Sequence, residues 1–289
     1  MKIDPRTIID ASQDITVNRT PPKPIVTKKQ SFESLGKYQW KPGKGDPSAP
    51  VYQLNESVQA SLSATVDLRQ YCSPIDDQGN LGSCTGNAIA GAIDLLDRKT
   101  HNLQTRVSRL FIYYYERLIE NDVNYDAGAY IHDGITVGRT YGAPQETLWP
   151  YNISAYRTRP SNTAIADAAR RKITQYQSIA NFTAMKNALA SGYPVIVGFN
   201  VYSSFEGSVN NNTGMMPYPN TRTESLLGGH AVCVVGYNDT LNGGRFICRN
   251  SWGTSWGNNG YFYMPYQVIQ NTSMSSDFWA IMAVNDPTN

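Results

Sequence analysis

The chain has 289 residues, of which 40% are hydrophobic and 17% are charged, and its formal net charge is +2. This balance is typical of a globular protein, and it gives no reason to expect a nucleic acid or a membrane as a partner. The sequence contains no apolar run of about 18 residues, and its first residues lack the apolar stretch of a secretory signal. We therefore expect a cytoplasmic location, or export by a signal-independent route.

Residues 1–60 differ in composition from the rest of the chain. They contain several prolines and few periodically spaced apolar residues, which favours an extended or irregular backbone. We expect this N-terminal extension either to lie along the body of the protein or to form a flexible tail. Residues 61–289 carry the periodic patterns of a folded domain.

Helical periodicity dominates the first half of that domain, and strand patterns dominate the second half. The predicted helices span 84–100, 108–121, 131–142 and 181–192, and the stretch 163–172 is either helical or the start of a strand. The predicted strands span 195–202, 230–239, 245–252, 260–266 and 279–284. This order indicates an α+β fold with a helical lobe at about 66–165 and a β-rich lobe at about 166–285. Binding sites usually lie in the cleft between such lobes.

The four cysteines differ in their surroundings. They are too few for a disulfide framework and do not have zinc-ligand spacing. The sequence also contains no phosphate-binding loop, so we expect no metal and no other cofactor. Cys233 and Cys248 lie in apolar runs, as buried structural cysteines do, and Cys72 stands beside a turn. Cys84 instead follows the glycine-containing loop 78–83 and directly precedes a predicted helix. Because a helix N-terminus lowers the pKa of a thiol, Cys84 is a candidate nucleophile.

A cysteine nucleophile needs a base, a group that orients this base, and donors for an oxyanion. His230 follows two glycines at the start of a predicted strand and is the candidate base. The side-chain amide of Asn250 can orient an imidazole, and Trp252 can shield their hydrogen bond from water. Gln78 can direct an amide N–H at the oxyanion, together with the backbone N–H of Cys84. Read alone, these residues could equally be a strand-edge histidine, a turn asparagine and a solvated glutamine.

Taken together, the set resembles the papain-like cysteine peptidase family, and in particular its bacterial members. The resemblance covers about residues 66–285 and rests on DLR (67–69), QGNLGSC (78–84), YGAPQETLWPY (141–151), GYPVIVGF (192–199), GGHAVCVVGY (228–237) and NSWGTSWGNNGYF (250–262). It implies a two-lobed α+β fold with a helical left lobe, a β-barrel-like right lobe and an active-site cleft between them. It also implies that Cys84 is the nucleophile, His230 the acid and base, Asn250 the orienting amide and Gln78 the oxyanion donor.

The same resemblance indicates where an extended substrate would bind. Residues 126–129 stand where the family has a Cys-Asn-Gly-Gly loop, whose backbone binds substrate by strand-like hydrogen bonds. We therefore expect Gly128 and Ala129 to bind substrate. Gly229 and Trp252 match positions that line the cleft beside the scissile bond and beside the catalytic histidine.

The sequence departs from the family pattern in several places, among them Ala129, which replaces the second glycine of the binding loop. Leu81 and Asp126 stand where the family has a disulfide-bonded cysteine pair, so this bridge is absent, which suits a reducing compartment. Thr85 and Gly86-Asn87 replace a tryptophan and an Ala-Phe pair that follow the nucleophile. We expect these smaller and more polar residues to open the rim of the cleft.

The sequence thus predicts a monomeric cysteine endopeptidase that hydrolyses peptides or proteins through a thioester on Cys84. Residues 1–60 are expected to be the prosegment of a zymogen and to lie across the mouth of the cleft. An exopeptidase or an acyl transferase could use the same site, and a non-catalytic binding module is a further alternative. The intact set of Gln78, Cys84, His230 and Asn250 argues against the binding module.

Overall fold

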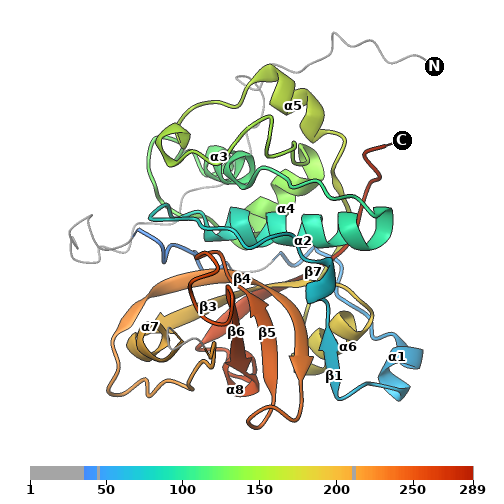
Figure 1. Ribbon diagram of the computed structural model, residues 1–289, viewed down its shortest axis with the longest axis vertical. Coiled ribbons are helices and arrows are strands. Elements are labelled where there is room, and N and C mark those ends of the chain that lie inside the picture. The colour runs from blue at the N-terminus through green and yellow to red at the C-terminus, as the bar shows by residue number, and fades with distance from the viewer. Residues whose placement is uncertain (1–35, 44–45, 210–212, 289) are drawn as a thin grey trace. The chain divides into compact units, whose positions relative to one another are not determined.

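The computed structural model describes residues 36–43, 46–209 and 213–288 (Figure 1). Residues 1–35 of the expected prosegment lie outside these described residues. The helices are α1 (Glu56–Ala60), α2 (Cys84–His101), α3 (Arg109–Ile119), α4 (Ile131–Thr140), α5 (Asn162–Ala168), α6 (Phe182–Ala190), α7 (Ser203–Val209) and α8 (Tyr266–Gln270), with 3-10 turns at Arg69–Tyr71 and Ile153–Ala155. The strands are β1 (Thr65–Asp67), β2 (Ile173–Ser178), β3 (Val195–Tyr202), β4 (Leu226–Asn238), β5 (Arg245–Arg249), β6 (Tyr261–Pro265) and β7 (Ser275–Val284).

The longer elements form where the sequence predicts them. The Ser108 hydroxyl accepts a hydrogen bond from the backbone N–H of Phe111, and the Asn181 side chain accepts one from Ala184, so both residues cap helices as their types favour. The ambiguous stretch 163–172 contains most of α5 and ends just before β2. The unpredicted elements α1, α7, α8, β1 and β2 have seven residues or fewer, too few to show a clear period.

The strands of the described residues form one antiparallel sheet in the order β2-β7-β3-β4-β5-β6, and β1 also pairs with β4. Strand β4 is central, because β3 pairs with its first part while β5 and β1 pair with its last part. In this register His230 lies opposite Phe199 of β3. The candidate histidine is therefore held against β3, just before the residues at which β4 also pairs with β5.

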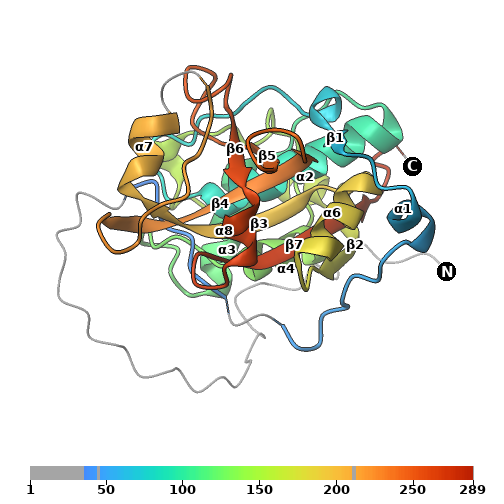
Figure 2. The same cartoon turned by 90° about the horizontal axis from the view of Figure 1, so that it is seen from below.

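Two hydrophobic layers cover the two faces of this sheet, and alternate residues of β4 face one layer or the other. Ala231 and Cys233 belong to the layer that includes α2, whereas Val232 and Val234 belong to the layer that includes α6. Figure 1 shows α2 next to the sheet and α3 and α5 farther from it. Figure 2 shows α6 and α8 on the side of the sheet that is seen from below. The observed architecture is the α+β, two-lobed fold that the sequence predicted.

All four cysteines are free thiols. Cys233 and Cys248 are fully buried, as the sequence predicted. Within the described ranges, no helix is both long and apolar enough to cross a membrane.

Candidate active site

Cys84 is the first residue of α2 and is fully buried where α2 packs against β4. Backbone amides of Ala231, Gln39 and Thr85 face the thiol and favour its ionised form. Ala231 directly follows His230 in β4. The fold thus brings the N-terminus of α2 and the histidine strand together, although 145 residues separate these two positions in the chain (84 to 230).

His230 and Asn250 form the pair that the sequence predicted. The Nε2 atom of the imidazole lies 2.8 Å from the Oδ1 atom of Asn250, and the imidazole is fully buried. The Trp252 ring lies over the imidazole, with ring centroids 4.7 Å apart and an interplanar angle of 30°. The Nδ1 atom of His230 has no hydrogen-bond partner among the described residues. A neutral imidazole that donates from Nε2 to the asparagine leaves Nδ1 as an acceptor, which is the state a base requires.

The Gln78 side chain is fully buried and is oriented by three contacts. Its Oε1 atom accepts a hydrogen bond from the Ser251 hydroxyl at 2.6 Å, which directs Nε2 to the other side. Nε2 donates to the carbonyl oxygen of Leu81 at 2.8 Å and to that of Lys37 at 3.4 Å. The amide therefore already donates to a peptide carbonyl from a distant part of the chain.

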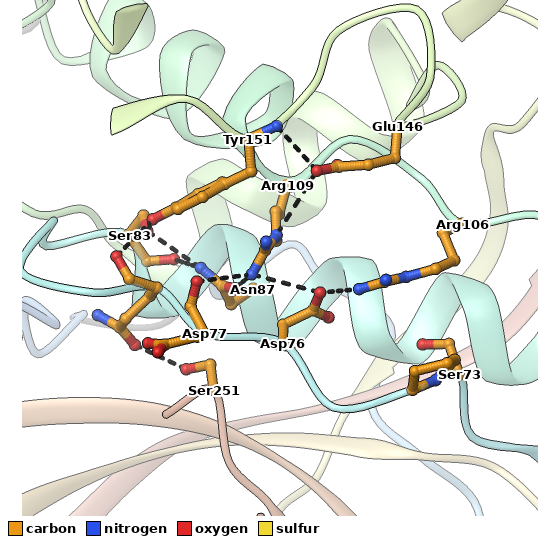
Figure 3. A network of polar contacts seen from close by, with 12 residues as sticks. Ser73, Asp76, Asp77, Ser83, Asn87, Arg106, Arg109, Glu146, Tyr151 and Ser251 are labelled. Atoms are coloured by element: carbon orange, nitrogen blue, oxygen red, sulfur yellow. Dashed lines mark hydrogen bonds and ion pairs between the residues drawn. The ribbon is translucent and has the colours of Figure 1, made fainter. Parts of the chain in front are cut away.

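A polar network in the helical lobe supports the loop that carries Gln78 (Figure 3). The Tyr151 hydroxyl donates to the Gln78 carbonyl oxygen at 2.9 Å and lies 2.6 Å from the Ser83 hydroxyl. The Arg109 guanidinium lies over the Tyr151 ring at 3.9 Å and donates to Asn87 Oδ1 at 3.0 Å. Sequence reasoning missed these roles, although Tyr151 ends one of the stretches that carry the family resemblance.

The same network reaches the sheet through the buried carboxylate of Asp76. It forms ion pairs with Arg106, with Arg109 at 3.3 Å and with Arg249 of β5 at 3.2 Å. Arg249 also donates to the carbonyl oxygen of Ser73 at 2.6 Å. These contacts connect the loop before Cys84 to both lobes, so the oxyanion side of the site is fixed from two directions.

Residues 36–43, here called the cleft segment, pass directly over these groups. The Tyr38 ring packs edge-on against both His230 and Trp252, with centroid distances of 6.3 and 5.5 Å. The backbone N–H of Trp40 donates to the carbonyl oxygen of Gly229, and that of Lys41 donates to the carbonyl oxygen of Ala129, each at 3.0 Å. The cleft segment therefore pairs with the sheet on one side and with the helical lobe on the other.

The cleft segment also explains the glycine at position 128. Gly128 has a φ of +68°, and a Cβ atom there would overlap the carbonyl oxygen of Gln39. Ala129 stands where the family has a second glycine, yet its carbonyl oxygen still accepts the bond from Lys41. Gly128, Ala129 and Gly229 therefore all contact the cleft segment.

Burial beneath the cleft segment keeps both candidate catalytic groups neutral. It raises the pKa of the Cys84 thiol to about 12, against the opposing effect of the surrounding amides. It lowers the pKa of His230 to about 4, although the bond to Asn250 acts in the opposite direction. Both shifts act against a thiolate–imidazolium pair while the cleft segment is in place. In the described residues no cluster of three or more potential metal ligands occurs.

A family model described as papain family cysteine protease matches residues 62–282. The chain belongs to the papain family. It is 43% identical over 237 residues to the uncharacterized peptidase C1-like protein L477 of Acanthamoeba polyphaga mimivirus, covering 78% of this chain and 75% of that protein. Among solved structures, xylellain, a cysteine protease from Xylella fastidiosa, is 38% identical with a TM-score of 0.81, covering 90% of this chain and 100% of that chain. Procathepsin B S9 from Trypanosoma congolense shares the fold at 18% identity and a TM-score of 0.69, with 86% of each chain covered.

As a papain-family cysteine peptidase, the chain is a hydrolase of peptides or proteins. One expectation about its departures from the family is wrong. Thr85 and Asn87 do not open the rim of the cleft, because both are buried inside the helical lobe. The Thr85 hydroxyl donates to Glu116 at 2.7 Å, and the Asn87 amide donates to the Ser83 carbonyl oxygen at 2.9 Å. Both side chains thus have polar partners inside the lobe.

The position of the missing disulfide is held by a carboxylate. Asp126 accepts hydrogen bonds from the backbone N–H of Gly82 at 3.0 Å and from the Tyr113 hydroxyl at 2.5 Å. Leu81 is buried and packs beside Tyr113 and Ala129. The two loops that a disulfide joins in other members of this papain family are thus joined by hydrogen bonds in this peptidase.

Proposed function

We propose that the chain is a cysteine endopeptidase made as a precursor, in which Cys84 is the nucleophile and the cleft segment restrains activity. One observation carries the proposal. The Gln78 amide donates to the carbonyl oxygen of Lys37, within a peptide that passes beside both Cys84 and His230. A substrate carbonyl in the same position would lie between the nucleophile and an oxyanion donor.

Each candidate residue then has a defined task in hydrolysis. The Cys84 thiol transfers its proton to His230, and its sulfur attacks the substrate carbonyl carbon while Gln78 Nε2 and the Cys84 backbone N–H stabilise the oxyanion. His230, oriented by Asn250, protonates the leaving amine as the C–N bond breaks and the thioester forms. His230 next accepts a proton from water, which attacks the thioester. The C–S bond breaks, the proton on His230 returns to the Cys84 sulfur, and the carboxylic acid product leaves.

The course of the cleft segment supports an endopeptidase. Gly36 lies against Asn80 on one side of the site, and Lys41 pairs with Ala129 on the other. A polypeptide can therefore pass through the site and continue in both directions. A cleft with this property accepts internal peptide bonds and does not require a chain end.

Hydrolysis of a doubly blocked peptide tests this function. We expect full-length protein carrying Trp40→Ala, which weakens the cleft segment, to cleave an internally quenched peptide whose two ends are blocked. The same chain with Cys84→Ala is the matched control and should cleave nothing. If only peptides with a free terminus were cleaved, the endopeptidase proposal would be wrong.

The restraint is tested by the unmodified full-length chain in the same assay. We expect it to cleave the peptide at least about tenfold more slowly than the Trp40→Ala chain, since a buried indole contributes more than one factor of ten in binding. Equal rates would contradict a restraining role for the cleft segment.

A further inference from the structure

The side chain of Trp40 fills a recess in the sheet. It is only 5% exposed and belongs to the main hydrophobic layer, although its neighbours Gln39 and Lys41 are partly exposed. The indole lies directly on the backbone of β3, where a Cβ atom at Gly198 would overlap the ring. It also covers Gly229 of β4. Because glycine leaves this part of the sheet bare, the recess accepts a flat side chain.

A carboxylate stands at the base of this recess. Asp277 of β7 accepts a hydrogen bond from Trp40 Nε1 at 3.4 Å on Oδ2, and one from Trp279 Nε1 at 2.6 Å on Oδ1. The backbone N–H of Gly43 also favours the ionised carboxylate. Burial acts against this ionisation and raises the pKa of Asp277. An open hollow lined in part by Gly43 and Asp277 adjoins the carboxylate, so solvent reaches it from one side.

Two of these three donors belong to the cleft segment. When the segment leaves, Trp40 and Gly43 leave with it, and Asp277 keeps only Trp279 within the sheet. His132, whose ring lies 5.5 Å from that of Trp279, is the basic group that acts on Asp277 electrostatically. The emptied recess would then contain a partly buried carboxylate oxygen that has lost its hydrogen-bond donors. Binding of a substrate group that supplies a new donor would be favoured.

We propose that the recess filled by Trp40 receives a side chain of the substrate, and that Asp277 makes the peptidase select arginine there. This inference rests on the proposed function of the site. Arginine fits the recess because its guanidinium is flat, as the indole is, and places charged N–H donors against a carboxylate. Its apolar stem can lie on Gly198. Trp40 supplies the same shape and a neutral N–H, so it fills the recess without the charge that the substrate would bring.

Residue 40 can be exchanged in the full-length chain to test the recess without any substrate. Trp40→Arg is compared with Trp40→Leu twice, once in the chain with Asp277 intact and once in the chain that also carries Asp277→Asn. The readout is the rate at which iodoacetamide labels Cys84, with the labelled cysteine identified by peptide mapping. Asp277 has a φ of +65°, a conformation that asparagine tolerates well, so Asp277→Asn should preserve the backbone. Melting temperatures of the variants check folding.

We expect Trp40→Arg to be labelled about tenfold more slowly than Trp40→Leu when Asp277 is intact, as a charge-assisted hydrogen bond implies. With Asp277→Asn the two rates should agree to within about threefold, because a neutral amide lacks the charge. An unchanged ratio in both backgrounds would overturn the role of Asp277, and so would slower labelling of Trp40→Leu.

A positional library of fluorogenic peptides, cleaved by the full-length Trp40→Ala chain, identifies the substrate side chain. We expect one position at which arginine is preferred over leucine and tryptophan, and we expect Asp277→Asn to abolish this preference. Cleavage with equal rates for the three residues would leave the peptidase intact and overturn the inference. Absence of cleavage of every peptide would contradict the proposed function itself, and the substrate assignment with it.

Discussion

Two stretches of the N-terminal extension lie on the same domain in different ways. The cleft segment, residues 36–43, is held by single backbone bonds to each lobe and by side chains that enter the active site. Residues 49–60, here called the anchor segment, pair with β2 through Tyr52 and Pro50, whose bonds to Ser178 measure 2.9 and 2.8 Å. Among the described residues, no hydrogen bond, ion pair or ring contact joins the anchor segment to Gln78, Cys84, His230 or Asn250.

The anchor segment is part of the folded body. Asn187 of α6 is fully buried and accepts hydrogen bonds from the Tyr52 hydroxyl and from the backbone N–H of Asn55, each at 2.9 Å. Its side-chain amide donates to the Asn55 carbonyl oxygen at 3.0 Å. We therefore propose that a mature enzyme keeps residues 49–60, and that activation removes or displaces only the part before them. Under this proposal the prosegment would end before residue 49, earlier than the sequence predicted.

The largest effect is expected from Trp40→Ala in the cleft segment. Loss of a buried indole costs about 3 kcal/mol, which corresponds to about 100-fold weaker occupancy of the cleft. Labelling of Cys84 by iodoacetamide in the full-length chain should rise accordingly at pH 7. A rise of less than about threefold would show that Trp40 does not hold the segment in place.

Asn187→Ala in α6 should destabilise the fold without exposing Cys84. It leaves buried polar groups of the anchor segment without partners, at a cost of about 2 kcal/mol, and so lowers the melting temperature by several degrees. Cys84 labelling below the melting transition should stay close to that of the unmodified chain. Strong labelling together with an unchanged melting temperature would remove the distinction between the two segments.

A smaller effect is expected from Tyr38→Phe. The Tyr38 hydroxyl donates to the Glu206 carboxylate of α7, and the phenyl ring of the variant keeps its packing on Trp252. Loss of one hydrogen bond of about 1 kcal/mol should speed Cys84 labelling about fivefold. Glu206→Gln is the matched variant, and it should cause a smaller change than Tyr38→Phe because a neutral acceptor remains.

The sequence predicted those parts of the site that depend on short motifs. Gln78 lies six residues before Cys84, and Asn250 lies two residues before Trp252. The proximity of each pair is therefore local and can be predicted from a short motif. The pairing of His230 with the start of α2 followed from the family resemblance. The fold class followed from long periodic stretches, which tertiary packing rarely overrides.

Other features depend on contacts that no local pattern encodes. Trp40 lies in a stretch without periodicity, and its burial depends on the bare backbone of Gly198, more than 150 residues later. Thr85 was expected at the rim because the residues it replaces are large, but the buried carboxyl of Glu116 gives its hydroxyl an interior partner. A sequence shows that a side chain has changed, whereas its new partner is visible only in the fold.

The dependence of Cys84 alkylation on pH tests the central claim most directly. With the cleft segment in place, burial raises the pKa of the thiol to about 12, so the thiol is protonated at neutral pH. We predict that the full-length chain is labelled slowly at pH 7, and that the rate rises about tenfold per pH unit up to pH 10. The Trp40→Ala chain should instead be labelled rapidly at pH 7, and His230→Ala should remove this reactivity. Rapid labelling of the unmodified chain at pH 7, with a plateau at neutral pH, would contradict restraint by the cleft segment.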